Sequence, residues 1–474
     1  MDTLDFSVDK TTGMIHPISP MKIHLRFTLL IAAALTLFLA GGTFAQSLIL
    51  KCQSDVRAKN FEAALISCEA AKGENAGVAS TGKAIAYSEL LKWPDAIREL
   101  TTVISINSNA VDLLYYRANA YYQNGEYRNA ISDLERALRL APQLKARLTT
   151  LLVQAKEMSD LTSPRKPSAA AEKKSLELSL AANTALVNRA VAVMNKAKPA
   201  ELEKFDQQVL SLVLEALAAN KYNAHAYSVR GSLYVAQKKD QPAIFEFSKA
   251  ILVDPKDATA YESRAKAYRE AKEYLFAIAD LSKAIELKPD NSMLYFSRAE
   301  LFELAGKNAE ALVDLDTCVR LRPNSSFGYI MRARFLMKHG MIDKAISDLN
   351  AALKIDPKDA ASLEARCEYY NLKGNFSAAL KDCTAGVDRA EPFVSDTARF
   401  ERIATYIGLK KFDLALADVA ALEKGGPYAA LSVQKGKVYK AQGKKAEAIK
   451  AFNEALASDP KNADAKKELA SLAQ

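Results

Sequence analysis

The sequence predicts an all-α fold, a solenoid of stacked antiparallel helix pairs, on three observations. Proline recurs at an interval of about 34 residues through the second half of the chain, which is typical of stacked supersecondary units. Each interval holds two segments of about a dozen residues with apolar side chains at helical spacing. Alanine is abundant, while the 474 residues include only 18 glycines and 15 prolines, a balance that favours close-packed helices.

The prolines define the repeat unit. They follow one another at intervals of 34, 34, 34, 35, 35 and 33 residues, at Pro255, Pro289, Pro323, Pro357, Pro392, Pro427 and Pro460. Small and large side chains recur at fixed positions before each proline, as in Tyr261, Ala265, Tyr268, Ala277, Leu281 and Ala284. A small residue lets two helices cross closely, and proline ends the pair because it cannot continue a helix. One such hairpin has too little core to fold alone, so neighbouring units must stack.

This pattern resembles the tetratricopeptide repeat. The resemblance covers nearly all of the chain after residue 45 and implies a right-handed superhelical solenoid of about ten units. It also implies that partners bind along a concave groove lined by the first helix of each unit. The family's clamp for C-terminal carboxylates is not implied, because its positions hold mixed residues such as Ser228, Glu262, Phe296 and Ile330.

The repeats fall into two predicted blocks. Three units ending at Pro142 form an N-terminal block over residues 46–160. The 113 residues from Pro142 to Pro255 are not a multiple of the period, and residues 161–174, with two prolines, serines and basic side chains, are the expected linker. Residues 175–474 form the second block, which opens with a degenerate repeat over about residues 176–221 and ends in a capping helix.

Residues 1–45 are not expected to belong to the fold. From Met21 two basic residues precede an apolar run over residues 27–40, and small residues follow up to Ala45, which is the layout of a secretory signal peptide cleaved after Ala45. The alternative, a transmembrane anchor, needs about 20 apolar residues, and this run is shorter. We interpret the acidic residues 1–20 as a mis-called start. The mature protein is then exported and does not span a membrane.

The charge balance restricts the partners only weakly. A formal net charge of +9 favours acidic proteins, anionic polymers or lipid head groups through long-range attraction. Nine lysines and five acidic residues lie between Lys435 and Gln474, a surface that is either solvated or in contact with an anionic envelope polymer. Nucleic acid is a poor candidate for an exported protein.

A basic and an acidic residue recur sixteen residues apart in seven units. The arginines are Arg117, Arg230, Arg264, Arg298, Arg332, Arg366 and Arg402, and their acidic partners are Asp133, Glu246, Asp280, Asp314, Asp348, Asp382 and Asp418. A ligand-binding arginine row is one interpretation. A feature copied into every unit more simply predicts ion pairs between the packed helices.

Four of the five cysteines occupy matched repeat positions. Cys52 and Cys68 are sixteen residues apart, as are Cys367 and Cys383, so in an oxidising compartment each pair would join the two helices of its hairpin. A loop of that length stabilises by about 3 kcal/mol in the chain-entropy model. The alternative is four buried thiols that act as small apolar residues. Cys318 stands alone and is interpreted as a core residue.

Enzymatic chemistry is not predicted. After residue 45 only His225 and His339 occur, which argues against a histidine-based metal cluster or catalytic triad. The sequence after residue 45 contains no nucleotide-binding, zinc-protease or nucleophile-elbow motif, so no catalytic residue, cofactor or metal site is expected. The single tryptophan, Trp93, is interpreted as packing.

The resemblance places partner contacts on the first helices of the units. It points to Met293, Phe296, Phe327, Ile330 and Met337, flanked by Lys266, Arg269 and Arg334, and in the N-terminal block to Tyr115, Asn119 and Tyr122. An apolar row bordered by charge suits an amphipathic helix or an extended peptide, and methionine adapts its shape to either. The alternative is that these side chains complete the core of a tight superhelix.

The sequence therefore favours an exported, non-enzymatic scaffold, periplasmic in a bacterium or secreted, that binds protein or peptide partners in an envelope or secretion assembly. Two rigid grooves joined by a linker would gain from effective concentration. One alternative is an anionic glycan or envelope-polymer binder that uses the basic surface. A second is a structural solenoid that self-assembles.

Overall fold

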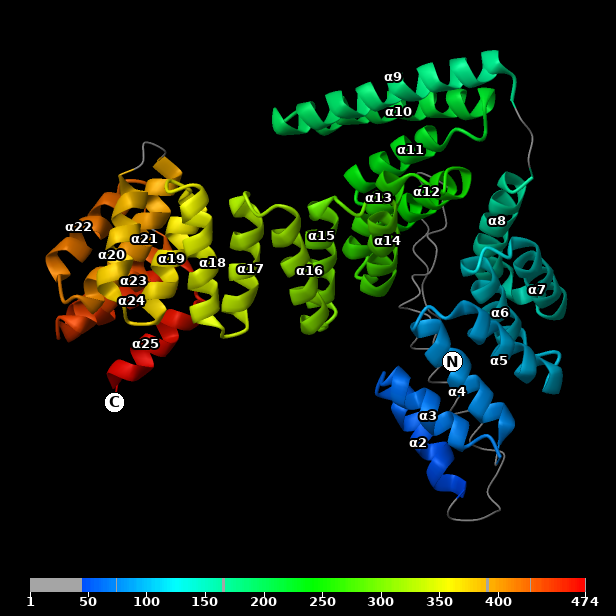
Figure 1. Cartoon of the computed structure of the whole chain (residues 1–474), viewed down its shortest axis with the longest axis horizontal. Helices are drawn as coiled ribbons and strands as arrows, with labels where there is room; N and C mark the ends of the chain where they lie inside the picture. The colour runs from blue at the N-terminus through cyan, green and yellow to red at the C-terminus, as the bar shows by residue number, and fades with distance from the viewer. Residues whose placement is uncertain (1–44, 74, 164–166, 389–391, 427, 474) are drawn as a thin grey trace. The chain divides into compact units, whose positions relative to one another are not determined.

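The computed structural model describes residues 45–473, except residues 74, 164–166, 389–391 and 427 (Figure 1). The predicted leader, apart from Ala45, lies outside the described residues. Within them the protein consists of α-helices joined by short turns, and no strand occurs. The helices form two compact units, residues 1–289 and 290–474, and each is described by itself. The predicted all-α fold of stacked antiparallel helix pairs is confirmed.

The first unit begins with three helix pairs and one single helix. These are α2 (Ala45–Arg57) with α3 (Phe61–Ala70), α4 (Ala76–Glu89) with α5 (Trp93–Ile106), α6 (Val111–Gln123) with α7 (Tyr127–Leu140), and α8 (Lys145–Leu161) after the 3-10 turn η2 (Pro142–Leu144). A long hairpin and two ordinary pairs follow. These are α9 (Ala169–Met194) with α10 (Pro199–Ala219), α11 (Ala224–Ala236) with α12 (Asp240–Val253), and α13 (Ala258–Glu270) with α14 (Tyr274–Leu287).

The second unit contains five helix pairs and a terminal helix. The pairs are α15 (Ser292–Leu304) with α16 (Asn308–Leu321), α17 (Ser326–Lys338) with α18 (Ile342–Ile355), α19 (Ala360–Leu372) with α20 (Phe376–Val387), α21 (Pro392–Gly408) with α22 (Phe412–Glu423), and α23 (Ala429–Ala441) with α24 (Lys445–Ser458). The expected capping helix is α25 (Ala463–Ala473), and Lys440 of α23 contacts its Glu468 at 2.6 Å.

Long helices account for the break in the repeat register. The helix α8 has 17 residues, and α9 and α10 have 26 and 21, whereas the helices of the neighbouring pairs have 13 or 14. The stretch expected to hold a degenerate repeat is therefore a long hairpin in which α9 and α10 lie side by side (Figure 1). Residues 169–174, which fall within the expected linker, form the first turns of α9. The division into blocks at residues 161–174 stays a prediction.

Local sequence explains where the helices begin and turn. Asn223 and Asp257 cap α11 and α13, since each side chain accepts a hydrogen bond from a backbone N–H of the first turn. The turn within most pairs uses a left-handed residue, usually glycine, as at Gly306 (φ 74°), or lysine, as at Lys272 (φ 63°), and in one turn Leu91 (φ 56°). A small residue permits close helix crossing, as at Gly436, where an added Cβ would lie 2.4 Å from the ring of Phe452.

The seven predicted basic and acidic partners all form ion pairs. The distances between charged atoms are 2.6 to 2.8 Å, and in six pairs the arginine donates to both oxygens of an aspartate. In at least four units the same guanidinium also donates to a side chain sixteen residues back: Thr101, Ser248, Asp316 and Asn350. One arginine therefore ties its own hairpin together and joins it to the preceding one.

Both predicted cysteine pairs lie at disulfide distance. The Cα atoms are 4.6 Å apart in Cys52 and Cys68 and 5.6 Å apart in Cys367 and Cys383, within the range that a disulfide spans. Each pair joins the two helices of its own hairpin, as the spacing predicts. Cys318 is a buried free thiol, in agreement with a core residue.

Candidate functional site

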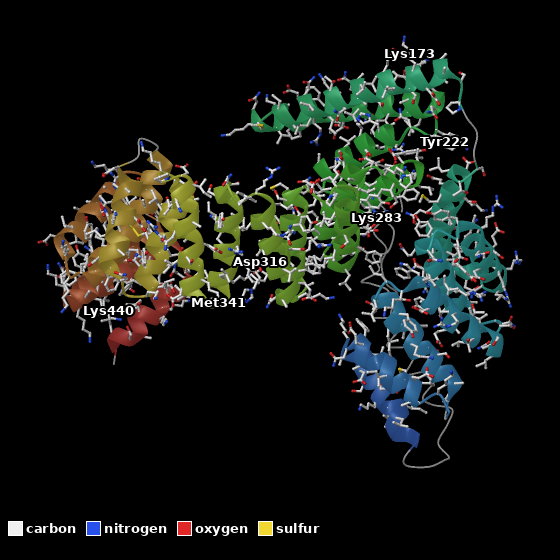
Figure 2. The ribbon with its side chains drawn as sticks, in the orientation of Figure 1. Lys173, Tyr222, Lys283, Asp316, Met341 and Lys440 are labelled. Carbon is white, nitrogen blue, oxygen red and sulfur yellow. A yellow bond between two sulfur atoms is a disulfide. The ribbon has the colours of Figure 1, made fainter. Side chains whose placement is uncertain are left out.

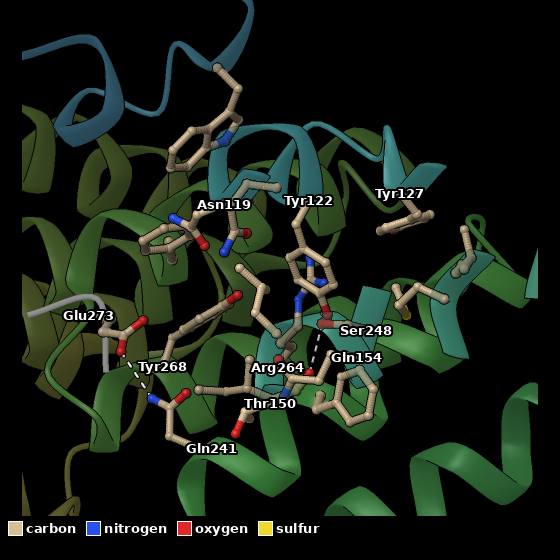
Figure 3. Close-up of a pocket in the computed structure, with 18 of the residues that line it drawn as sticks. Asn119, Tyr122, Tyr127, Thr150, Gln154, Gln241, Ser248, Arg264, Tyr268 and Glu273 are labelled. Atoms are coloured by element: carbon tan, nitrogen blue, oxygen red, sulfur yellow. Dashed lines mark hydrogen bonds between the residues drawn. The ribbon is translucent and has the colours of Figure 1, made fainter. Parts of the chain in front are cut away.

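A cavity of about 980 Å³ lies inside the first unit (Figure 3). Residues 91–158, on α5 to α8 and the turns between them, supply one wall, and residues 241–280, on α12 to α14, supply the other. Its volume is at the upper end of the range for ligand pockets, about 300 to 1,000 Å³. The cavity is therefore large enough for several residues of a peptide.

Aromatic rings form much of its lining. Phe276 stacks on Tyr268 at a centroid distance of 5.1 Å and on Trp93 at 6.0 Å, so α5 and α14 meet through their rings. Tyr122 and Tyr127 pack edge to face at 5.5 Å. Such pairs add about 0.5 to 1.5 kcal/mol beyond the area that they bury. The packed rings therefore supply the apolar walls of the cavity.

The arginines in the lining are already paired with protein carboxylates. Arg147 donates to Asp112 at 2.9 Å. Arg264 donates to both oxygens of Asp280 and, at 2.9 Å, to the Ser248 hydroxyl (Figure 3). Because each guanidinium already has a carboxylate partner, the arginines of the cavity offer little to attract a negatively charged ligand.

Neutral polar groups are what the lining offers to a ligand. Gln241 donates to Glu273 at 3.1 Å. By contrast, the side-chain amides of Asn119, Gln143 and Gln154 have no hydrogen-bond partner among the residues that the structure describes. An amide carries both donors and an acceptor, so these groups match the N–H and C=O groups of a peptide backbone.

The tyrosine hydroxyls of the cavity stay neutral. Burial raises the pKa of Tyr122 well above its usual range, and burial raises the pKa of Tyr268 as well. Both phenols therefore keep their protons across the physiological pH range and remain available as hydrogen-bond donors.

The structure brings together the three candidates of the N-terminal block. Tyr115, Asn119 and Tyr122 all line the cavity from α6. Tyr115 is only 7% exposed and lies under Arg147, whose guanidinium carbon is 4.8 Å from the ring centroid. Asn119 and Tyr122 are half-buried, and Figure 3 shows both among the lining residues.

In the second unit, part of the predicted apolar row is accessible. Met293 is 44% exposed on α15. Phe296 and Phe327 are half-buried, and their rings pack edge to face at 5.1 Å between α15 and α17. These three side chains form a small apolar surface on the first helices of two adjacent repeats.

The remaining candidates of α17 differ in exposure. Ile330 is 5% exposed and belongs to the hydrophobic core around α17 and α18, so it offers no surface to a partner. Met337 is half-buried at the edge of the same core, and Arg334 is exposed. Lys266 and Arg269 are exposed on α13 of the first unit, where they contact Glu262 and Glu270 at 2.7 and 3.0 Å.

Sequence reasoning missed the cavity residues that lie outside α6. Trp93 packs, as interpreted, but it does so against Phe276, which is far away in the sequence, and it also lines the cavity. Gln154 lies on α8 and Gln241 on α12, neither of which is the first helix of a repeat in the predicted register. No local pattern in the sequence marks them, because the two walls of the cavity come from separate stretches, residues 91–158 and 241–280.

The described residues form neither a metal-binding cluster nor a membrane-spanning helix. Among them, no group of His, Cys, Asp or Glu side chains has an arrangement that could hold a metal ion. Likewise, none of the described helices combines the length and apolar character needed to cross a bilayer. The apolar run over residues 27–40 lies outside the described residues.

Three segments match models of the tetratricopeptide repeat. They are residues 111–144, which contain α6 and α7, residues 328–359, which contain α18 and all but the first two residues of α17, and residues 429–462, which contain α23 and α24. The chain therefore carries tetratricopeptide repeats, as the sequence pattern indicates. Proteins built from these repeats generally bind other proteins or peptides and are typically non-catalytic. No curated protein matches this chain.

Solved structures with similar folds include a tetratricopeptide repeat protein from Parabacteroides merdae, with 18% identity, a TM-score of 0.42, and coverage of 52% of this chain and 98% of that one. PilW, a type IV pilus biogenesis factor, has 18% identity, a TM-score of 0.39, and coverage of 45% and 98%. YrrB, a repeat protein with an unusual peptide-binding site, has 23% identity, a TM-score of 0.32, and coverage of 39% and 95%.

Proposed function

We propose that this protein is an exported, non-enzymatic repeat scaffold that binds an extended, uncharged and predominantly apolar peptide segment of a partner protein in the cavity of the first unit. The observation that carries the proposal is the way in which the polar side chains of the cavity lining are paired. The arginines are neutralised by protein carboxylates, whereas the amides of Asn119 and Gln154 have no partner within the described residues. Aromatic walls accept apolar side chains, and free amides pair with a peptide backbone.

The single tryptophan provides a direct assay. Trp93 stacks on Phe276 in the cavity wall, so a peptide that enters should change its fluorescence. Peptides selected from a random nonapeptide display library on the purified protein would be titrated by tryptophan fluorescence and by calorimetry. We expect the selected peptides to be rich in apolar residues and poor in charged ones, and their affinity to change little with salt, because no ion pair forms.

Substitutions separate this site from other surfaces. Gln154→Leu removes the amide with little change of volume, and losing one hydrogen bond of about 1 to 1.5 kcal/mol should weaken binding roughly tenfold. Gln207→Leu, on the exposed surface of α10 and outside the cavity lining, is the matched control and should leave affinity unchanged. Equal effects of the two variants, or selection of charged peptides, would contradict the proposal.

The same assay tests the anionic-polymer alternative, which rests on the basic surface. Dextran sulfate is the probe. If it binds with strong salt dependence while no library peptide is retained, the basic surface becomes the working site and the cavity proposal fails.

The apolar surface of the second unit is a second candidate site, because Met293, Phe296 and Phe327 lie on adjacent first helices. Two sites on one chain would let it hold two segments of one partner, with a gain from effective concentration. Met293→Glu changes a largely accessible side chain and should weaken binding of a two-segment partner without affecting a peptide that occupies the cavity.

Export is proposed from the two cysteine pairs at disulfide distance together with the leader layout of the sequence. Intact mass and N-terminal sequencing of the chain from a bacterial envelope fraction test it. We expect a chain that begins at Gln46 and has lost the hydrogens of four thiols. A chain that keeps the apolar run would support the anchor, and reduced thiols would support buried cysteines without disulfides.

A further inference from the structure

The long helix α9 has a buried face made mostly of small residues and an exposed face that carries large apolar residues. Its fully buried positions are mostly small, at Ser175, Ser179, Ala182, Ala185 and Ala192. A second set is exposed although its members are mainly large and apolar: Leu176 (52%), Leu180 (51%), Val187 (54%), Val191 (49%) and Met194 (81%). A helix that packs only within its own protein normally places its large apolar side chains on the buried side.

The exposed set forms one continuous stripe. Leu176, Leu180, Asn183, Val187, Ala190 and Met194 follow at spacings of four, three, four, three and four residues, and all six are exposed. Spacings that alternate between four and three residues are those of a coiled-coil seam. At about 1.5 Å per residue the stripe is about 27 Å long. Figure 1 shows α9 packed against α10, and in Figure 2 Lys173 marks the start of the helix.

We propose that this stripe pairs with the same stripe of a second copy of the chain, parallel and in register. The argument for a second copy rests on Asn183, the one polar residue in the stripe. In parallel register every stripe residue meets itself, so the amides of Asn183 hydrogen-bond to one another, whereas a slipped or antiparallel pair would bury them against Leu180 or Val187. A single asparagine at a seam position selects register in this way.

The charge distribution is compatible with self-pairing. Between residues 178 and 195 the only charged residue of α9 is Arg189, and it is buried in an ion pair with Asp206 of α10. Like charges therefore do not meet along this part of the seam. A membrane surface is a weaker candidate occupant, because α9 has no aromatic residue and the exposed basic residues lie only at the two ends of the stripe, at Lys173 and Lys174 and at Lys196 and Lys198.

Sedimentation equilibrium of the purified protein tests the proposal. A stripe of this length is shorter than a standard interface, so we expect a dimer with a dissociation constant on the order of 10 µM, seen as a rise in mass between about 1 and 200 µM. The double variant Leu180→Glu, Val187→Glu should remain monomeric with an unchanged thermal melting curve, because both side chains are exposed. Val313→Glu, at a 63% exposed position of α16, is the matched control and should still dimerise.

Two further measurements fix the geometry. A mixture of the glutamate double variant with Leu180→Lys, Val187→Lys should restore a heterodimer, because opposite charges then face each other. Asn183→Cys should cross-link two copies under mild oxidation, and Asn188→Cys, exposed on α9 away from the stripe, should not.

Any one of three results would overturn the proposal. The first is a parent protein that stays monomeric to about 200 µM. The second is dimerisation that the glutamate variant leaves intact. The third is a monomer that binds vesicles of phosphatidylglycerol through the stripe.

Discussion

The guanidinium of Arg332 connects two aspartates of different exposure, and their removal should have very different effects. Arg332 donates to both oxygens of Asp348 at 2.8 and 2.6 Å within its own repeat, and to Asp316 of the preceding repeat at 2.7 Å. The side chain of Asp348 is 10% exposed and that of Asp316 is 56% exposed. One positive charge thus takes part in one buried and one solvated ion pair.

The expected magnitudes follow from burial. Asp348→Ala removes two charge-assisted hydrogen bonds and leaves Arg332 against the core, and breaking a buried pair in this way costs about 3 to 5 kcal/mol. We expect a loss at the lower end of this range, about 3 kcal/mol, because the Arg332 side chain is 21% exposed to solvent. Asp316→Ala removes a solvated partner and should cost about 0 to 1 kcal/mol. Replacing both Arg332 and Asp348 by leucine should recover part of the loss, since no charge is left buried.

The assay has to be local, because a repeat array is not one two-state unit. Amide hydrogen exchange in α17 and α18 reports the opening of this repeat. A loss of about 3 kcal/mol corresponds to exchange about a hundredfold faster. Equal and small changes for the Asp348→Ala and Asp316→Ala variants would refute the reasoning, since the ladder would then not hold the repeat together.

Three other predictions concern single positions. An added Cβ at Gly82 would lie 2.6 Å from Cys68 Sγ. Gly82→Ala should therefore lower the melting temperature of the oxidised protein by the equivalent of about 1 to 3 kcal/mol. Gly73→Ala is the control and should leave the melting temperature unchanged, because a Cβ there meets no atom within 4 Å. Burial, followed by the neighbouring carboxylate of Glu368, raises the pKa of Glu401 to about 7. Between about pH 4.5 and pH 7 the native state therefore keeps a proton that the unfolded state has lost, so the free energy of unfolding should fall as the pH rises through this range. Glu401→Gln should flatten that fall in denaturation scans. Lys272→Gly should raise the denaturation midpoint by the equivalent of about 1 kcal/mol, because its φ of 63° suits glycine, and an unchanged or lower midpoint would contradict this.

Features that repeat could be predicted from the sequence. The proline period, the helix pair and the spacing between Arg332 and Asp348 recur in many units. Once the register of one unit is known, the positions of the corresponding residues in the other units follow. Ion pairing across sixteen residues follows because that distance spans one antiparallel hairpin. The cysteine spacing is the same geometry used once more at Cys52 and Cys367.

Features that occur once could not be predicted in this way. The stripe on α9 was missed because its residues fell in a stretch interpreted as a degenerate repeat, where a period of 34 was imposed on helices of 26 and 21 residues. The cavity was missed because its two walls are separated by about a hundred residues, and no local pattern records that Trp93 reaches Phe276. Exposure was also not visible, so Ile330 looked like its neighbour Phe296 although only Ile330 is fully in the core.

The ion pairs between the two cavity walls explain why the effect of salt on peptide affinity tests the proposed function. Lys249 of α12 is 4% exposed, and its Nζ atom lies 2.9 Å from a carboxylate oxygen of Glu157 on α8, which is 92 residues away in the sequence. The same atom lies 3.0 Å from a carboxylate oxygen of Glu246. A second bridge, from Lys221 to Asp160 at 2.6 Å, is solvated on both sides. Salt screens the Lys221 bridge more than the contacts of Lys249, because the Lys249 side chain is buried although that of Glu157 is 47% exposed, so the walls should keep their distance as ionic strength rises. A loss of peptide affinity with salt would then report charge on the ligand and would not reflect opening of the cavity.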